Sequence, residues 1–256
     1  MKNILFILLN IIVMDATAQL QPIPSGAMHW NDFPVKKETG RESRKIAEGT
    51  SPEFEYFEMH ATTQYKGAAP KPAHTQKDIE ELIIIKEGTV KCTIGNKTAV
   101  LGAGGVMLIP PLQSQTFENI GDGPLTYYVF MFRSKKGMNM LRSDTAGGAL
   151  LLNKDSLQFK ASAKGGGRKY FDRPTAMCDN MEMHVTKLDH KGSSHAPHQH
   201  VDTEIILVID GTVEMMIEGK TYTANPGDLI MAESGKLHGV GNAEEKPCSY
   251  FAFKWR

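Results

Sequence analysis

Three side chains that could bind a metal ion lie within seven residues of one another: His198, His200 and Glu204, in the segment 192–211. On an extended strand, residues two positions apart point to the same side, so both imidazoles and the carboxylate would share one face. Two nitrogen ligands with one oxygen suit a divalent transition metal better than calcium or magnesium, which prefer oxygen alone. The segment therefore predicts a transition-metal site.

The composition is that of a soluble globular protein large enough for one large or two ordinary domains. Of the 256 residues, 41% are hydrophobic and 23% are charged. The 29 acidic residues balance the 29 basic ones, so no net field favours nucleic acid or an anionic membrane. We expect a small-molecule substrate, with neither nucleic acid nor a membrane as partner.

Residues 1–18 are typical of a cleavable secretory signal. A basic tip precedes a short apolar run, and Ala16 and Ala18 form an Ala-x-Ala site. A buried N-terminal helix is the alternative interpretation. The apolar run is too short to span a bilayer comfortably. We expect export to the periplasm or the medium after cleavage near Ala18.

The cysteines do not indicate a disulfide framework or a thiolate zinc site. Cys92, Cys178 and Cys248 are odd in number and widely spaced, with no Cys-x-x-Cys pair. We interpret them as small core residues, although one disulfide between two of them is open in an oxidising compartment.

The chain contains two copies of one unit. Residues in the first copy recur 123 to 125 positions later, and the matches include Glu58-Met-His60 with Glu182-Met-His184, His74 with His198, Glu81 with Glu204, Gly88 with Gly211, Asn119 with Asn242, and Arg133 with Arg256. The repeat predicts units at 30–134 and 154–256, joined by a linker at 135–153. An apolar piece of the linker, 149–152, could add a strand to a neighbouring sheet, and the glycine run 165–167 is expected to be a flexible loop.

Each unit is expected to be all-β. Short segments rich in β-branched and aromatic residues alternate with Gly, Pro and Asn turns at roughly ten-residue spacing, which is typical of a sandwich or barrel. Examples are 82–85, 90–94, 106–109 and 127–132. No long amphipathic helix is evident.

The second copy resembles the cupin family. Gly192, His198, His200, Glu204 and Gly211 fit every position of the first cupin motif, and Gly227, Gly235, His238 and Asn242 fit most of the second, with Glu233 where the family usually has Pro. The resemblance covers both repeats and implies a bicupin made of two double-stranded β-helix (jelly-roll) barrels in tandem.

The same resemblance implies one mononuclear metal site. Its ligands would be His198, His200, Glu204 and His238, holding a divalent ion of manganese, iron, nickel, zinc or copper. One or two coordination positions would stay open for water, substrate or dioxygen. A set without thiolate differs from the closed structural zinc site, which favours chemistry or ligand capture over a stabilising role.

The first copy is expected to lack a working metal site. His74 and Glu81, or its neighbour Glu80, stand at ligand positions, but Gln76 and Gln115 replace the other two histidines. An amide oxygen is a weaker neutral ligand for these metals. We interpret this barrel as degenerate, serving to pack against the other one or to bind a ligand without metal.

Other residues near the motif have weaker signals. His195, on the loop before the first ligand, is a candidate general acid or base, although an exposed loop histidine is the commoner outcome. Glu182 and His184 recur as Glu58 and His60, which favours a scaffold role. Lys236, beside His238, could steer an anionic substrate.

The family resemblance suggests several functions. A dioxygenase resembling quercetinase or pirin-like cupins is the first expectation. Metal-assisted isomerisation, decarboxylation or hydrolysis, as in ureidoglycine aminohydrolase, is the second. A small-molecule or sugar-binding cupin without turnover is the third. Barrel edges would also allow a homodimer.

Overall fold

The computed structural model describes residues 19–256; the predicted signal 1–18 lies outside the described residues. Within this range, α1 (Met140–Thr145) is the only α-helix, and two short 3-10 helices cover Trp30–Asp32 and Lys154–Ser156. The remaining elements are strands arranged in four sheets. The prediction of an all-β chain of two tandem jelly-roll barrels is confirmed.

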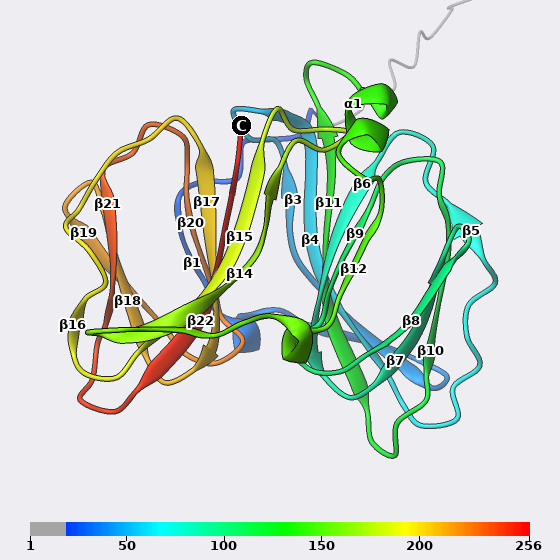
Figure 1. Ribbon diagram of the computed structural model, residues 1–256, viewed down its shortest axis with the longest axis horizontal. Coiled ribbons are helices and arrows are strands. Elements are labelled where there is room, and N and C mark those ends of the chain that lie inside the picture. Colours follow the sequence, from blue (N-terminus) through cyan, green and yellow to red (C-terminus); the bar gives the residue numbers. More distant parts are fainter. Residues whose placement is uncertain (1–18) are drawn as a thin grey trace, which may run out of the picture.

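The first barrel, on the right in Figure 1, has a seven-stranded and a four-stranded sheet. The larger sheet contains, in spatial order, β12 (Leu150–Leu152), β9 (Val106–Ile109), β6 (Glu80–Glu87), β11 (Leu125–Ser134), β4 (Phe54–Gln64), β3 (Arg41–Gly49) and β2 (Val35–Glu38). The smaller sheet contains β5 (His74–Thr75), β10 (Ser114–Asn119), β7 (Val90–Ile94) and β8 (Lys97–Leu101).

The second barrel, on the left in Figure 1, repeats this arrangement. Its larger sheet contains β1 (Gly26–Met28), β20 (Leu229–Ala232), β17 (Thr203–Asp210), β22 (Cys248–Trp255), β15 (Met181–Leu188), β14 (Gly165–Arg173) and β13 (Lys160–Ser162). Its smaller sheet contains β16 (Gly192–Ser193), β21 (His238–Asn242), β18 (Val213–Ile217) and β19 (Lys220–Ala224).

The two units exchange their first strands. β1, which precedes the first unit, pairs with β20 of the second barrel, and β12, from the segment predicted as linker, pairs with β9 of the first. In Figure 1 the blue β1 accordingly lies among the yellow-to-red strands. Each exchanged strand covers a sheet edge that would otherwise expose unpaired backbone groups. The apolar piece at 149–152 therefore does add a strand to the neighbouring sheet.

The long strands are apolar on both faces because each face packs against a different core. On β17, Ile205 and Leu207 belong to a core between the barrels, whereas Ile206 and Val208 belong to the interior of the second barrel. The larger sheets face each other across the shared core, where the rings of Phe54 and Trp255 stack with centroids 5.4 Å apart. This alternation follows from the two-residue period of a strand.

The expectation that the glycine run 165–167 forms a flexible loop is wrong. These residues begin β14 and pair with β13 and β15. A Cβ at Gly165 would lie 2.2 Å from the Lys187 carbonyl oxygen, and one at Gly166 would lie 2.5 Å from that of Lys160. The glycines therefore allow close strand approach, a use of glycine that composition alone does not distinguish from a loop.

The cysteine interpretation is confirmed, since Cys92, Cys178 and Cys248 are all buried and unpaired. Within residues 19–256, no helix combines the length and the hydrophobicity that crossing a membrane requires.

Candidate metal centre

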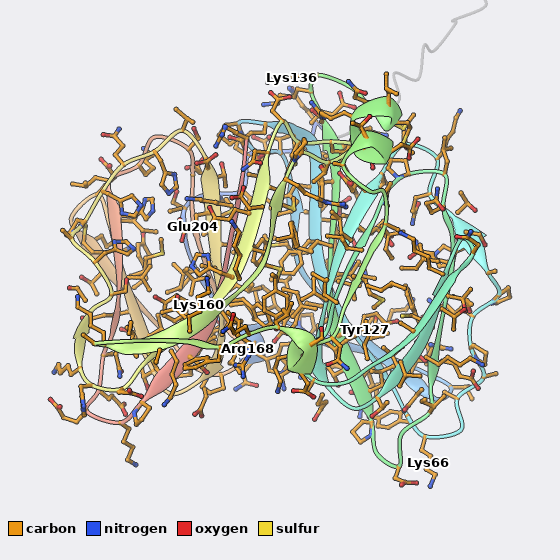
Figure 2. The ribbon with its side chains drawn as sticks, in the orientation of Figure 1. Lys66, Tyr127, Lys136, Lys160, Arg168 and Glu204 are labelled. Atoms are coloured by element: carbon orange, nitrogen blue, oxygen red, sulfur yellow. The ribbon has the colours of Figure 1, made fainter. Side chains whose placement is uncertain are left out.

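Four side chains converge inside the second barrel. The ligand atoms of His198, His200, Glu204 and His238 all lie within 4.8 Å of one another. Glu204 comes from β17 in the larger sheet and His238 from the start of β21 in the smaller sheet. Figure 2 labels Glu204 inside this barrel. The four residues expected to bind metal thus form one compact group.

The backbone that presents the histidines differs from the expected single strand. β17 begins only at Thr203, and residues 198–200 belong to the preceding loop. His198 is held by an isolated bridge, in which its backbone N–H and that of His238 donate to each other's carbonyl oxygens at 2.8 and 2.9 Å. The Gly235 N–H donates to the carbonyl of His200 at 2.8 Å. The start of β21 and the turn before it therefore position the loop.

Hydrogen bonds orient two of the imidazoles for metal binding. The Nδ1 atom of His200 lies 3.0 Å from the Asp202 carbonyl oxygen, and that of His238 lies 2.8 Å from the Lys236 carbonyl oxygen. Because a carbonyl oxygen only accepts, these bonds place the proton on Nδ1 and leave the Nε2 lone pair free. Both Nε2 atoms face Glu204 Oε2, at 3.1 and 3.4 Å.

The donor set fits a divalent transition metal. The buried Nδ1 of His198 and Nε2 of His238 have no hydrogen-bond partner, which is unusual for buried polar atoms and is explained if they bind an ion. Three imidazoles and one carboxylate, without thiolate, match the ligands of an open catalytic site rather than a closed structural one. The site would hold one ion through these four residues.

Charges within the site keep the carboxylate ionised. Burial acts to raise the pKa of Glu204, but the neighbouring His200 and His238 outweigh it and hold the pKa well below its usual range. Burial lowers the pKa of His198, assisted by the nearby histidines. A deprotonated carboxylate beside a neutral imidazole is the protonation state that metal binding requires.

A cavity of about 160 Å³ adjoins the metal ligands and contains a lysine that sequence analysis missed. The cavity reaches His198 and Glu204 and is also lined by His184 and Lys254. Lys254 on β22 lies directly opposite Glu204 on one neighbouring strand and opposite Glu182 on the other. The three side chains therefore share the face of the sheet that points into the barrel. Its ammonium lies 3.4 Å from the Glu182 carboxylate.

The repeat contained a signal for this lysine. Lys254 corresponds to Met131, which pairs with Glu81 and Glu58 in the same way. A lysine in the copy with four ligands, against methionine in the other, distinguishes the two interiors. Position 254 lies outside both cupin motifs, so the motifs alone do not identify it.

The other candidate residues lie around the same cavity. His195 is exposed at its edge, with its ring centroid 4.5 Å from that of His198. His184 lies inside, 3.5 Å from Glu182. Burial is the main cause that lowers the pKa of His184. Lys236 is partly buried, and its carbonyl orients His238. A catalytic role for His195 stays a prediction.

The corresponding group in the first barrel is held by amides. Gln115 Nε2 donates to Glu81 Oε2 at 2.6 Å, and Gln76 Nε2 donates to Glu81 Oε1 at 3.1 Å. The neighbouring Glu80 instead points to the interface between the barrels, where Thr175 Oγ1 donates to it at 2.6 Å. Glu81 is therefore the residue equivalent to Glu204, and its carboxylate is satisfied without a metal.

Comparisons with known proteins agree with this architecture. A segment of 56 residues is 38% identical to the pectin degradation protein KdgF of Dickeya dadantii; it covers 22% of this chain and about half (51%) of that protein. Among solved structures, Ylba from E. coli has a TM-score of 0.69 at 16% identity, covering 94% of this chain and 95% of that one. The likeness to Ylba, at this identity, supports the fold alone.

Two oxalate decarboxylases are also similar in structure. That of Lactobacillus farciminis has a TM-score of 0.70 at 10% identity, covering 91% of this chain and 87% of its own. That of Bacillus subtilis, described with Mn(II) centres, has a TM-score of 0.66 at 14% identity and coverages of 90% and 77%.

The family model described as "Cupin domain" matches residues 61–131 and 184–254, more than half of the chain. The chain therefore belongs to the cupin family and carries two cupin domains in tandem.

Proposed function

We propose that this protein is a metal-dependent enzyme that converts a small organic acid, of the sugar-acid type, without consuming dioxygen. The observation that carries the proposal is Lys254, whose side chain lines the cavity that reaches His198 and Glu204. An ammonium beside a metal centre suits a substrate with a carboxylate and a second oxygen donor.

The metal would supply Lewis-acid polarisation of a substrate oxygen. Manganese is our proposal for its identity, because a structurally similar oxalate decarboxylase is described with Mn(II) centres. Lys254 would hold the carboxylate of the substrate. His184, inside the same cavity, and His195, at its edge, can each accept or donate a proton near the bound substrate.

The names of the similar proteins support an acidic substrate. Oxalate is a dicarboxylate, and pectin is a polymer rich in uronic acid, so both names point to carboxylates. The cavity, at about 160 Å³, suits a monomeric acid rather than a polymer. We therefore propose a uronic-acid monomer or a related small acid as the substrate.

A dioxygenase is the second candidate. Four protein ligands leave two positions in a six-coordinate centre, enough for a substrate oxygen and for dioxygen. The two functions differ in one requirement, because a dioxygenase consumes oxygen with every turnover and Lewis-acid isomerisation, decarboxylation or hydrolysis does not.

The test uses manganese-loaded protein with galacturonate, oxalate and the unsaturated monomers from a lyase digest of polygalacturonate. Substrate loss is followed in air and under anaerobic conditions. We expect equal turnover in both, and turnover that stops without oxygen would support the dioxygenase instead. Absence of turnover with every acid would favour a binding protein.

Lys254→Met is the matched variant, because methionine occupies the equivalent position in the first barrel. Losing an ion pair with the substrate should raise KM at least about tenfold while manganese stays bound. An unchanged KM would remove Lys254 from the substrate site and with it the main support for an acidic substrate.

A further inference from the structure

We infer that the first barrel holds a second binding site, which takes a neutral polyhydroxylated molecule such as a monosaccharide without a metal. A cavity of about 150 Å³ opens inside this barrel and is lined mainly by polar side chains. Figure 2 labels Tyr127, which lines it. The inference is independent of the proposed function, which concerns the second barrel.

An unsatisfied amide is the first observation. Gln64 is 2% exposed, lines the cavity, and has an Oε1 atom without a hydrogen-bond partner. Its Nε2 donates to the hydroxyl oxygen of Tyr127 at 3.1 Å. Leaving a buried acceptor unpaired costs free energy, so the free oxygen is explained if a ligand donates to it. A hydroxyl group is such a donor.

The second barrel shows what this position looks like when it only packs. Gln64 pairs with Leu125, and its repeat equivalent Leu188 pairs with Cys248. Leu188 is buried and needs no partner. The first barrel has therefore exchanged an apolar interior residue for one with unmet hydrogen-bonding capacity, which packing alone does not require.

An aromatic wall is the third observation. The rings of Phe117 and Tyr127 meet edge to face with centroids 5.9 Å apart, and both line the cavity. The equivalent of Phe117 is Val240, which occupies the matching ladder position. Aromatic rings beside hydrogen-bonding groups suit a sugar, which has both C–H faces and hydroxyls.

The charges favour a neutral ligand. The buried Glu81 carboxylate accepts from the amides of Gln76 and Gln115, so it places negative charge deep in the cavity. Lys71 also lines the cavity, but it is exposed, so its positive charge offsets that of Glu81 only at the opening of the cavity. A carboxylate ligand would face this charge across a poorly solvated space, whereas a polyol would add hydroxyl donors to it.

The test measures sugar binding to metal-free full-length protein. Galactose, glucose and xylose are titrated separately by calorimetry, with saturation-transfer NMR to detect weak binding. Galacturonate is the charged comparison and is titrated into Lys254→Met, in which the second barrel lacks the group that would hold its carboxylate. We expect at least one neutral sugar to bind, and to bind more tightly than galacturonate. Failure of all three neutral sugars to bind, or tighter binding of galacturonate, would overturn the inference.

Two variants assign the site. Gln64→Leu and Phe117→Val install the residues of the second barrel, and each should weaken sugar binding at least about tenfold without loss of folded protein, judged by thermal unfolding. His238→Ala, in the metal centre, should leave sugar binding unchanged. Sugar affinity that survives both first-barrel changes, or that disappears in His238→Ala, would place the sugar elsewhere and refute the inference.

Discussion

The two barrels retain the same contacts in their loops and turns but present different side chains inside. Arg133 pairs with Asp78 at 2.8 Å in the first barrel, and Arg256 pairs with Asp202 at 2.7 Å in the second. Asn119 and Asn242 each donate Nδ2 to a carbonyl four residues later, at 2.9 and 2.8 Å. Because these contacts are retained without the full ligand set, the scaffold does not depend on the metal.

The difference lies in the side chains around the carboxylate that each barrel carries at the same position. Glu204 faces two imidazoles, and Glu81 accepts from two amides. An amide donates a hydrogen bond but is a poor ligand for a transition metal, so the same position changes from a metal centre to a polar wall. In the first barrel, two amides therefore replace two of the metal-binding imidazoles.

The largest expected effect comes from removing a ligand of the second barrel. His200→Ala should reduce metal-dependent turnover by at least about a thousandfold and abolish the rise in Tm that manganese gives the wild type, because three ligands hold the ion poorly. The metal-free Tm should change little. Gln76→Ala, its repeat equivalent, is the control and should keep both the activity and the manganese effect.

The converse experiment builds a metal site in the first barrel. The double variant Gln76→His and Gln115→His completes four ligands around Glu81, together with the retained His74. Since the backbone of the loop is already anchored, we expect a second manganese ion to bind, with lower affinity because His74 is exposed. Calorimetric titration should give two equivalents per chain. A single equivalent would show that backbone geometry, not only ligand identity, separates the barrels.

The smallest effect concerns acid stability. The pKa of Glu58 is lowered from its ordinary value of 4.5 to about 2, chiefly by the adjacent imidazole of His60 and against the effect of burial. A carboxyl group with a lowered folded-state pKa stabilises the fold above about pH 4.5 and loses this contribution as the pH falls toward 2.

Glu58→Gln should therefore cost about 1 kcal/mol of unfolding free energy near neutral pH, with allowance for solvent screening, and flatten the loss of stability in that acid range. Denaturant unfolding at several pH values measures it. The matched Glu182→Gln should have less effect, because its contact to His184 is longer, at 3.5 Å against 2.8 Å. Equal losses of unfolding free energy in the two variants would mean that the distance between carboxylate and imidazole does not determine this contribution to stability.

The sequence was sufficient for the ligands and the fold class because both depend on local patterns. Spacing identified His198, His200 and Glu204, and the resemblance to the cupin family added His238; the structure brings the four together. The single-strand geometry was wrong because the bridge between His198 and His238 joins residues 40 positions apart in the chain, and a local pattern does not report such a contact.

Long-range contacts also account for the other omissions. β1 pairs with β20 about two hundred residues later, and a three-residue strand carries no periodic signal. Lys254 enters the site through cross-strand pairing with Glu204, which becomes evident only once the register is known. The unsatisfied oxygen of Gln64 depends on packing from several strands, so composition does not predict it.

The most direct test of the central claim is the number of manganese ions per chain, counted by native mass spectrometry after metal loading and removal of excess. We expect one ion in the wild type and in Gln115→Ala, and none in His238→Ala. Two ions in the wild type, or equal loss of the ion from the two variants, would contradict it.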